Sequence, residues 1–244
     1  MQKILALVGV LAAAGCNAPM RYHANRPVPL PVQPAPIATQ TNGVLPPQEA
    51  ARNFVSVVAR VEPVAEAYCR DMARVPNCDF RIVIDDRPGQ PPNAFQTLDQ
   101  QGRPIIAFSL ALIADARNAD EIAFVLGHEA SHHIAGHIPK AAQSAQTGAI
   151  LAGLIAAASG LGQAEIQQAQ RMGAGVGART YSKDFELQAD ALGAEIAFHA
   201  GYDPERGAGF FDRLPDPGDQ FLGSHPPNAQ RKAQISAVMA RLRG

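Results

Sequence analysis

The sequence predicts an α+β domain that is mainly helical and carries a small β-sheet. Apolar residues recur at helical spacing over most of the chain after residue 48. Short apolar runs bounded by turn residues, which are typical of strands, fall between residues 80 and 109. With 47% hydrophobic residues in a chain of 244, one sizeable core is expected, while 20 prolines and no tryptophan indicate that part of the chain is linker.

Residues 1–15 have the pattern of a targeting segment. Lys3 supplies the positive start, and Ile4–Ala14 is an apolar run too short for a transmembrane helix, which needs about 20 residues. Ala13-Ala14-Gly15-Cys16 resembles a bacterial lipoprotein signal, in which Cys16 becomes the lipidated N-terminus. Cleavage by an ordinary signal peptidase, with Cys16 as a bystander, is the alternative. Asn17 after the cysteine resembles signals for sorting to the outer membrane.

Residues 16–48 are expected to be a tether. Prolines nearly alternate with other residues at Pro27, Pro29, Pro31, Pro34 and Pro36, and such sequence favours extended conformations without a core. Residues 49–244 then form the folded domain.

The elements of this domain follow in order along the chain. Residues 48–74 read as a helix that Pro63 kinks, and Phe80–Asp85 reads as a strand. Two further strands, Ala94–Leu98 and Ile105–Ser109, are expected to form a hairpin around a turn at 99–102. A helix follows from Asn118 or Ala119 to a stop at Gly136. Helices are also expected at 204–214 and 228–242.

Between the helix that stops at Gly136 and residue 171, the chain is almost free of charge. In Ala141–Gln170 the one charged residue is Glu165. The apolar run Ala149–Ala158 is too short to span a bilayer. We interpret this region as a helical cover over a cleft.

Charge and cysteine content limit the partners and the cellular compartment that the chain can have. The formal net charge is −1, from 21 basic and 22 acidic residues, so nothing favours nucleic acid as a partner. If Cys16 carries lipid, Cys69 and Cys78 remain as an even pair, which predicts a disulfide in an oxidising compartment. Two buried free thiols are the alternative.

The strongest chemical signal is His128-Glu129-Ala130-Ser131-His132. Residues four apart stand on one helix face, so both imidazoles can reach one cation while Glu129 lies beside them. Neutral imidazoles are good zinc ligands, and a catalytic zinc site takes three protein ligands and leaves a position for water. Zinc acidifies that water, and Glu129 could take its proton as general base. The alternative is a helix that carries histidines at this spacing by chance.

A third ligand has to come from elsewhere in the chain. His133 is rotated about 100° from His132 on a helix, so it is expected to pack or support rather than bind the metal. His137 lies beyond the helix, and its direction is left open. A ligand ten residues after His128 would be Ile138, which excludes the three-histidine metzincin pattern. Glu186 is the best candidate, and Asp190 one turn later could orient a ligand histidine.

The motifs together resemble a known family. HEASHHIAGH at 128–137, ELQAD at 186–190, Ser224-His225-Pro226-Pro227 and Asn93-Ala94-Phe95 are similar to motifs of the gluzincin metallopeptidase family that contains HtpX, BepA and the CAAX prenyl protease. The resemblance covers about residues 49–244.

The resemblance implies a zincin-like fold, with a small sheet beside the motif helix, and a zinc endopeptidase activity. It assigns one Zn²⁺ per chain to His128, His132 and Glu186, and the role of general base to Glu129. It also places the strand of Asn93, Ala94 and Phe95 at the active-site cleft. With the signal sequence, it indicates a lipid-anchored enzyme on the periplasmic face of the cell envelope, at the outer membrane. The expected substrates are misfolded or misassembled envelope proteins.

Two questions stay open at this point. His225, in a proline-rich loop, is expected either to hydrogen-bond the oxyanion of the transition state or to occupy the open zinc position as a latch. An ordinary loop histidine is the alternative. For the whole chain, the alternative function is a chaperone-like assembly factor that binds chains in the same cleft, with latched or structural zinc.

Overall fold

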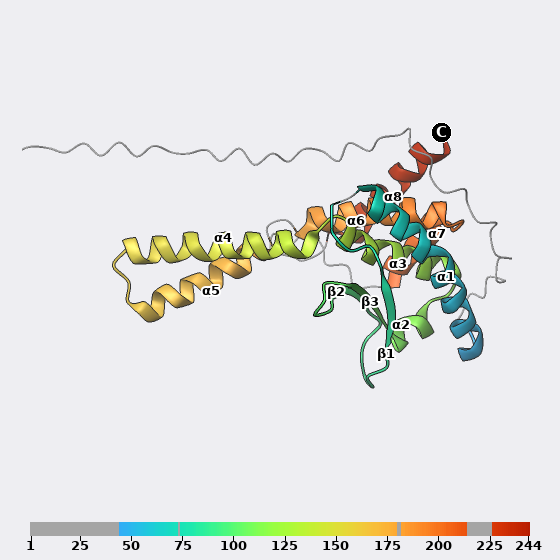
Figure 1. The fold of residues 1–244 in the computed structure, drawn as a ribbon, viewed down its shortest axis with the longest axis horizontal. Coiled ribbons are helices and arrows are strands. Elements are labelled where there is room, and N and C mark those ends of the chain that lie inside the picture. Colours follow the sequence, from blue (N-terminus) through green and yellow to red (C-terminus); the bar gives the residue numbers. More distant parts are fainter. Residues whose placement is uncertain (1–43, 73, 180–181, 214–225) are drawn as a thin grey trace, which may run out of the picture.

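A computed structural model describes residues 44–72, 74–179, 182–213 and 226–244 (Figure 1). The predicted signal peptide with Cys16, most of the tether, and the loop with Ser224 and His225 lie outside the described residues. The elements in chain order are α1 (Pro47–Met72), β1 (Arg81–Asp85), β2 (Ala94–Leu98), β3 (Pro104–Ser109), α2 (Leu110–Asp115), α3 (Ala119–Ile134), α4 (His137–Ala158), α5 (Gln163–Arg179), α6 (Ser182–His199), α7 (Pro204–Gly207), a 3-10 helix (Ala208–Arg213) and α8 (Asn228–Arg243).

The architecture confirms the predicted mainly helical α+β fold with a small sheet. The sheet has the order β1-β3-β2, in which β1 runs parallel and β2 antiparallel to β3. The predicted hairpin of β2 and β3 is present, and Gly102 adopts a positive φ of 78° in its turn, a conformation that glycine adopts without strain. The parallel pairing of β1 was not foreseen. It leaves β2 as an edge strand.

Helix α3 occupies the centre of the helical layer and is buried along most of its length. It begins where predicted, because the Asn118 side chain accepts a hydrogen bond from the backbone N–H of Glu121 at 3.1 Å. It ends before Gly136, which adopts a left-handed conformation with φ 67°. The N-terminal acids Asp120 and Glu121 are buried and paired with Arg206 and Arg213. These pairs fix the segment of α7 and the 3-10 helix against the start of α3.

Helix α6 lies against α3 at very short range because two glycines meet there. A Cβ atom added at Gly193 would lie 2.7 Å from the backbone nitrogen of His128, and one at Gly127 would lie 2.7 Å from the carbonyl oxygen of Gly193. No larger residue fits at either position without a shift of backbone. The close approach brings the N-terminal half of α6 to the histidines of α3.

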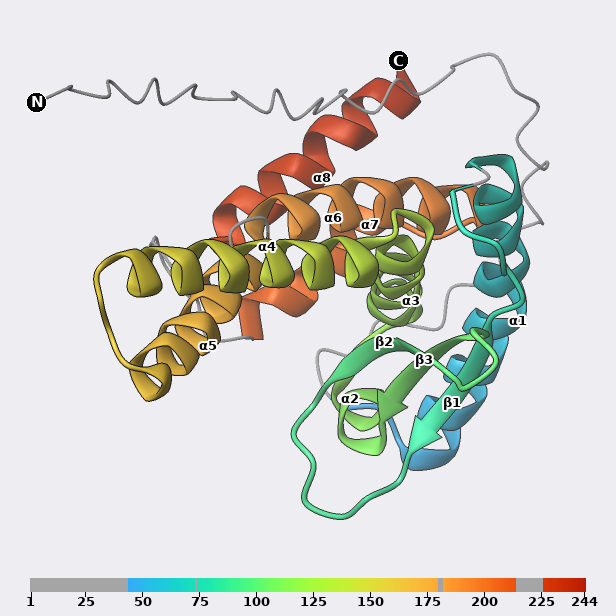
Figure 2. The same cartoon turned by 60° about the vertical axis from the view of Figure 1, so that its left-hand side comes forward.

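Helices α4 and α5 form a hairpin that projects away from the sheet and from the other helices (Figures 1 and 2). The expectation of a cover over the cleft was wrong. No residue of α5 lines the cleft, and Ile138 at the base of α4 is the one residue of the hairpin that does, among the residues described. The reason is that small residues of α4 and α5 pack against each other. At Gly148, Gly173 and Gly177 their backbones touch, leaving no room for a Cβ atom.

The expectation that this region is too short to span a bilayer also needs correction. Within the described residues, α4 is the one helix that is long and apolar enough to cross a membrane by length and composition. The prediction counted only the run Ala149–Ala158. The helix itself has 22 residues, and its polar residues before that run carry no charge apart from Lys140.

The sulfur atoms of Cys69 and Cys78 are joined in a disulfide, with Cα atoms 5.6 Å apart. It connects the last turn of α1 to the segment that leads into β1. The bridge fixes the backbone at Asn77, whose carbonyl oxygen contacts α3.

Candidate metal centre and cleft

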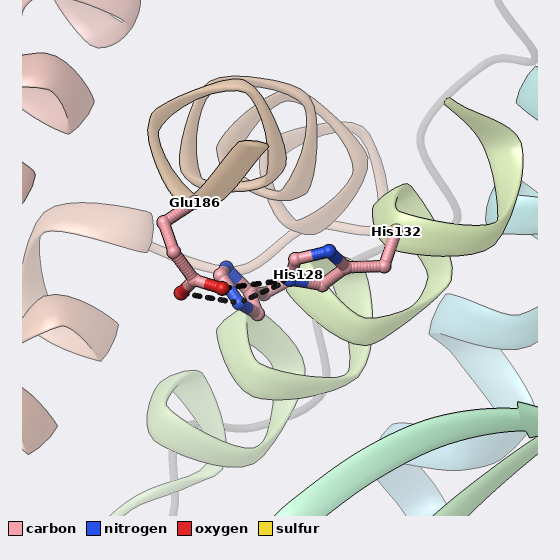
Figure 3. Close-up of side chains that lie close together, drawn as sticks. All are labelled: His128, His132 and Glu186. Atoms are coloured by element: carbon pink, nitrogen blue, oxygen red, sulfur yellow. Dashed lines mark hydrogen bonds and ion pairs between the residues drawn. The ribbon is translucent and has the colours of Figure 1, made fainter. Parts of the chain in front are cut away.

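Three side chains from two helices converge beside the cleft (Figure 3). His128 and His132 stand one turn apart on α3, and Glu186 reaches them from the first half of α6. Their ligand atoms all lie within 4.8 Å of one another. The structure therefore brings together the residues predicted as metal ligands.

The distances between the ligand atoms match a tetrahedral centre. Nε2 of His128 lies 3.1 Å from Nε2 of His132 and 3.5 Å from a carboxylate oxygen of Glu186, and the other carboxylate oxygen lies 3.4 Å from Nε2 of His132. Zinc bonds of about 2.0–2.1 Å in tetrahedral geometry separate the ligand atoms by about 3.3–3.4 Å. These residues fit a Zn²⁺ ion, and three ligands leave one tetrahedral position for water or substrate.

Asp190 orients His128 from behind. It is fully buried, and its Oδ1 lies 3.0 Å from Nδ1 of His128. Arg231 on α8 donates to both carboxylate oxygens, at 2.8 Å from Nε and 2.6 Å from Nη2. Because Asp190 accepts the Nδ1 proton, the Nε2 lone pair of His128 points to the metal position. The predicted orienting role of Asp190 therefore has a geometric basis.

The charges around His128 favour its proton when no cation is bound. Burial alone lowers the pKa of His128, but hydrogen bonds and charges of Asp190 and Glu186 outweigh burial and raise it to about 10. Burial likewise raises the pKa of Asp190, and hydrogen bonds from Arg231 and His128 reverse this, so that its pKa lies below the ordinary value. The pocket is negative enough to hold a positive charge, either a proton or a metal ion.

His137, whose direction could not be predicted, supports the second ligand. Its Nδ1 lies 2.9 Å from Nδ1 of His132, its Nε2 lies 3.5 Å from Oε1 of Gln188, and its ring stacks on Phe185. Burial, followed by the charge of His132, lowers the pKa of His137 to about 3. A neutral His137 that donates from Nε2 to Gln188 accepts the Nδ1 proton of His132. That tautomer leaves Nε2 of His132 free for the metal.

His133 points away from this centre. Its Nε2 donates to the carbonyl oxygen of Asn77 at 2.6 Å, and its ring packs edge to face on Phe80. The prediction that His133 packs or supports rather than binds the metal agrees with this position.

The cavity beside the three ligands has a volume of about 450 Å³. Glu129 lines it next to His128 and His132, and edge strand β2 lines it with Ala94 and Phe95, together with Asn93 just before the strand. Ser109 fixes the start of β2, because its hydroxyl accepts from the backbone N–H of Asn93 at 2.9 Å and donates to the carbonyl oxygen of Pro91 at 3.0 Å. The sequence-predicted catalytic and substrate-binding residues therefore share one cleft, except His225, which lies outside the described residues.

The comparison with protein families agrees with this arrangement. The model of peptidase family M48 matches residues 54–239, most of the chain. The chain belongs to peptidase family M48. This confirms the resemblance to the family of HtpX, BepA and the CAAX prenyl protease, and M48 membership indicates a metallopeptidase. M48 metallopeptidases generally bind zinc, which the spacing of the ligand atoms fits. No curated protein shows a significant match to the chain.

Sequence reasoning missed Arg231 and Gln188 of this M48 site and left the direction of His137 open. Arg231 lies 103 residues from His128 in sequence, and its guanidinium also packs 4.0 Å from the ring centroid of Phe211. His137 and Gln188 stand on helices whose relative position no periodicity gives. The one available signal was spacing, since Gln188 lies between Glu186 and Asp190 in the same motif.

Proposed function

We propose that this M48 metallopeptidase is a zinc endopeptidase of the bacterial cell envelope that cleaves misfolded or misassembled envelope proteins. The observation that carries the endopeptidase activity is the open cleft that joins Glu129, the three ligand side chains and the edge of β2. A structural zinc site would normally be closed by a fourth Cys or His ligand.

The edge of β2 supports the recognition of an extended chain. Backbone hydrogen bonds join Asn93 to Ser109 and Asp99 to Arg103 across the hairpin. In an antiparallel pair the hydrogen-bonded residues alternate, so the N–H and C=O groups of Ala94 and Gln96 point to the free edge. An unfolded segment can pair there as a further strand, which selects extended chains with little dependence on sequence.

The chain's own residues divide the reaction between them. Bound zinc would polarise the scissile carbonyl and acidify the attacking water. Glu129 takes a proton from the water while the water oxygen attacks the carbonyl carbon. Glu129 then delivers this proton to the amine nitrogen as the C–N bond breaks. Asp190 and His137 hold the ligand histidines in the tautomers that leave Nε2 free.

The location is inferred from the signal sequence and from the disulfide. The lipoprotein-type signal supports attachment through Cys16 to the periplasmic face of the outer membrane, and the predicted disulfide chemistry of Cys69 and Cys78 fits an oxidising compartment. More than one acyl chain would make this anchoring stable.

One experiment on the cleft tests how substrates bind. Ala94→Pro removes an N–H group at the first residue of an edge strand, a position where proline is tolerated. We expect slower cleavage of unfolded casein by the purified chain, with unchanged thermal stability and zinc content. Thr97→Val, which leaves the backbone intact in the same strand, serves as control. Equal cleavage by Ala94→Pro and the wild type would exclude strand pairing at this edge.

A second experiment separates the protease from the alternative, an assembly factor that only binds chains. A zinc chelator should stop cleavage of casein by the protease. If untreated protein binds casein but does not cleave it, the alternative holds, or His225 latches the site. His225→Ala distinguishes these, because removal of a latch would start cleavage.

A further inference from the structure

The hairpin of α4 and α5 carries an apolar stripe that nothing in the described structure covers. Ile150, Leu151, Leu154 and Ile155 are 52%, 56%, 62% and 68% exposed. Side chains at this spacing lie on one face of a helix. Such a group of exposed large apolar side chains marks a surface that binds another protein or a membrane.

The stripe cannot turn inward, because the hairpin is already packed. The face of α4 that carries Gly148 is in backbone contact with Gly173 and Gly177 of α5. No residue of α5 is buried, and in the second half of α4 only Gly153 and Ala156 are. The hairpin is therefore a preformed element whose apolar face points away from its own partner helix.

The absence of charged residues around the stripe indicates which kind of partner it contacts. Residues 141–164 contain no Asp, Glu, Lys, Arg or His. A protein–protein interface normally has a polar, solvent-accessible rim around its apolar core. The boundary between lipid headgroups and acyl chains also accepts apolar side chains, and buried apolar area is one source of affinity for it.

The chain outside the described residues brings this surface to a bilayer. If Cys16 is lipidated, which is part of the proposed function, residues 17–43 link the anchor to the domain. Even fully extended they span at most about 100 Å. The hairpin then meets the membrane at a high effective concentration, so that weak intrinsic affinity is enough for contact.

We propose that the α4–α5 hairpin lies on the lipid bilayer, with the stripe of Ile150, Leu151, Leu154 and Ile155 inserted at the headgroup–acyl boundary. It lies on the bilayer rather than crossing it. Although α4 is long and apolar enough to cross a membrane by itself, a crossing hairpin would also bury Glu165 and Arg171 of α5.

The contact has a consequence for the active site. Only Ala135 and Gly136 separate α3, which carries His128 and His132, from α4. Ile138 at the base of α4 also lines the cleft. A hairpin that rests on lipid therefore keeps the cleft within about 33 Å of the membrane, the length of this 22-residue helix.

Vesicle flotation tests the proposal on the mature chain, without the predicted signal peptide 1–15, carrying Cys16→Ser, which removes the lipid anchor, and Glu129→Gln, which prevents self-cleavage. The probe is vesicles of phosphatidylethanolamine and phosphatidylglycerol. We expect the chain to float with vesicles, and the double variant Leu151→Glu/Ile155→Glu to partition at least tenfold more weakly. The matched control is Val44→Glu/Val55→Glu, which adds the same charge at two exposed valines outside the hairpin and should float like the parent.

Three outcomes would overturn the proposal. The parent chain could stay unbound, or both double variants could float equally. Light scattering in vesicle-free buffer could also show that the parent is a dimer and that Leu151→Glu/Ile155→Glu is a monomer. That result would assign the stripe to contact with a second copy of the chain. Casein cleavage without vesicles by Leu151→Glu/Ile155→Glu carrying Glu129 should equal the wild type. Cleavage and labelling of Cys16 with palmitate test the proposed function separately from flotation.

Discussion

Gly193 on α6 lies directly against the backbone of His128 on α3. An added Cβ atom would come within 2.7 Å of the His128 nitrogen and 2.8 Å of its Cα atom. The same helix carries Glu186, which lies near Nε2 of His128, and Asp190, which lies near Nδ1 of the same ring. The spacing of the metal ligands therefore depends on a glycine that contacts no metal.

Gly193→Ala should damage the site without unfolding the domain. The methyl group pushes α6 away from α3, and a shift of about 1 Å at a catalytic site costs about 10²-fold in rate. We expect a loss of this order in casein cleavage and weaker zinc binding, with helical content by circular dichroism retained. Gly175→Ala on α5, where an added Cβ meets no atom within 4 Å, is the control and should leave cleavage unchanged. Full activity of Gly193→Ala would show that the helices tolerate separation.

His137→Ala should weaken zinc binding although His137 is no ligand. Loss of its Nδ1 leaves the Nδ1 proton of His132 without an acceptor, and partners of this kind contribute about 10–100-fold to metal affinity. Competition with a fluorescent zinc chelator measures the change. His133→Phe removes a neighbouring imidazole that points away from the site, and it should retain zinc like the wild type. Equal zinc affinity in His137→Ala and the wild type would contradict the role given to His137.

Protonation of His199 should lower the free energy of unfolding in mild acid. Burial lowers the pKa of His199, whose Nδ1 lies 2.8 Å both from the carbonyl oxygen of Glu195 and from the hydroxyl of Tyr68. Since the folded pKa lies below the unfolded value of about 6.5, this contribution is complete above pH ~6.5 and is lost as the pH falls through the folded pKa. Urea unfolding between pH 7 and 5 should show it, by at most about 1.4 kcal/mol per pH unit. His199→Gln should flatten the slope, and an unchanged slope would assign the effect to other groups.

The local elements of the fold were predictable because their signals are local. Asn118 and Gly136 mark the ends of α3, and the turn before Arg103 marks the hairpin of β2 and β3. Likewise, the spacing of His128 and His132 places both on one face of α3, and the spacing of Glu186 and Asp190 places both on one face of α6.

The arrangement of the elements was less accessible. Composition shows that α4 is apolar over Ala149–Ala158, but it does not show that glycines pair α4 with α5 and carry the hairpin away from the cleft. Arg231 belongs to α8, far along the chain, and reads from sequence as a surface residue. Its guanidinium is buried between Asp190, which accepts two hydrogen bonds from it, and the ring of Phe211.

The central claim is that Glu129 acts as general base beside a zinc ion held by His128, His132 and Glu186. The most direct test is casein cleavage by the wild type and by Glu129→Gln, with zinc content measured on both proteins. The account predicts about one zinc per chain in each, and cleavage reduced by about 10²–10⁴-fold in the variant, as expected for loss of a general base. Equal cleavage by the two proteins, or a purified wild type that cleaves without zinc, would contradict it.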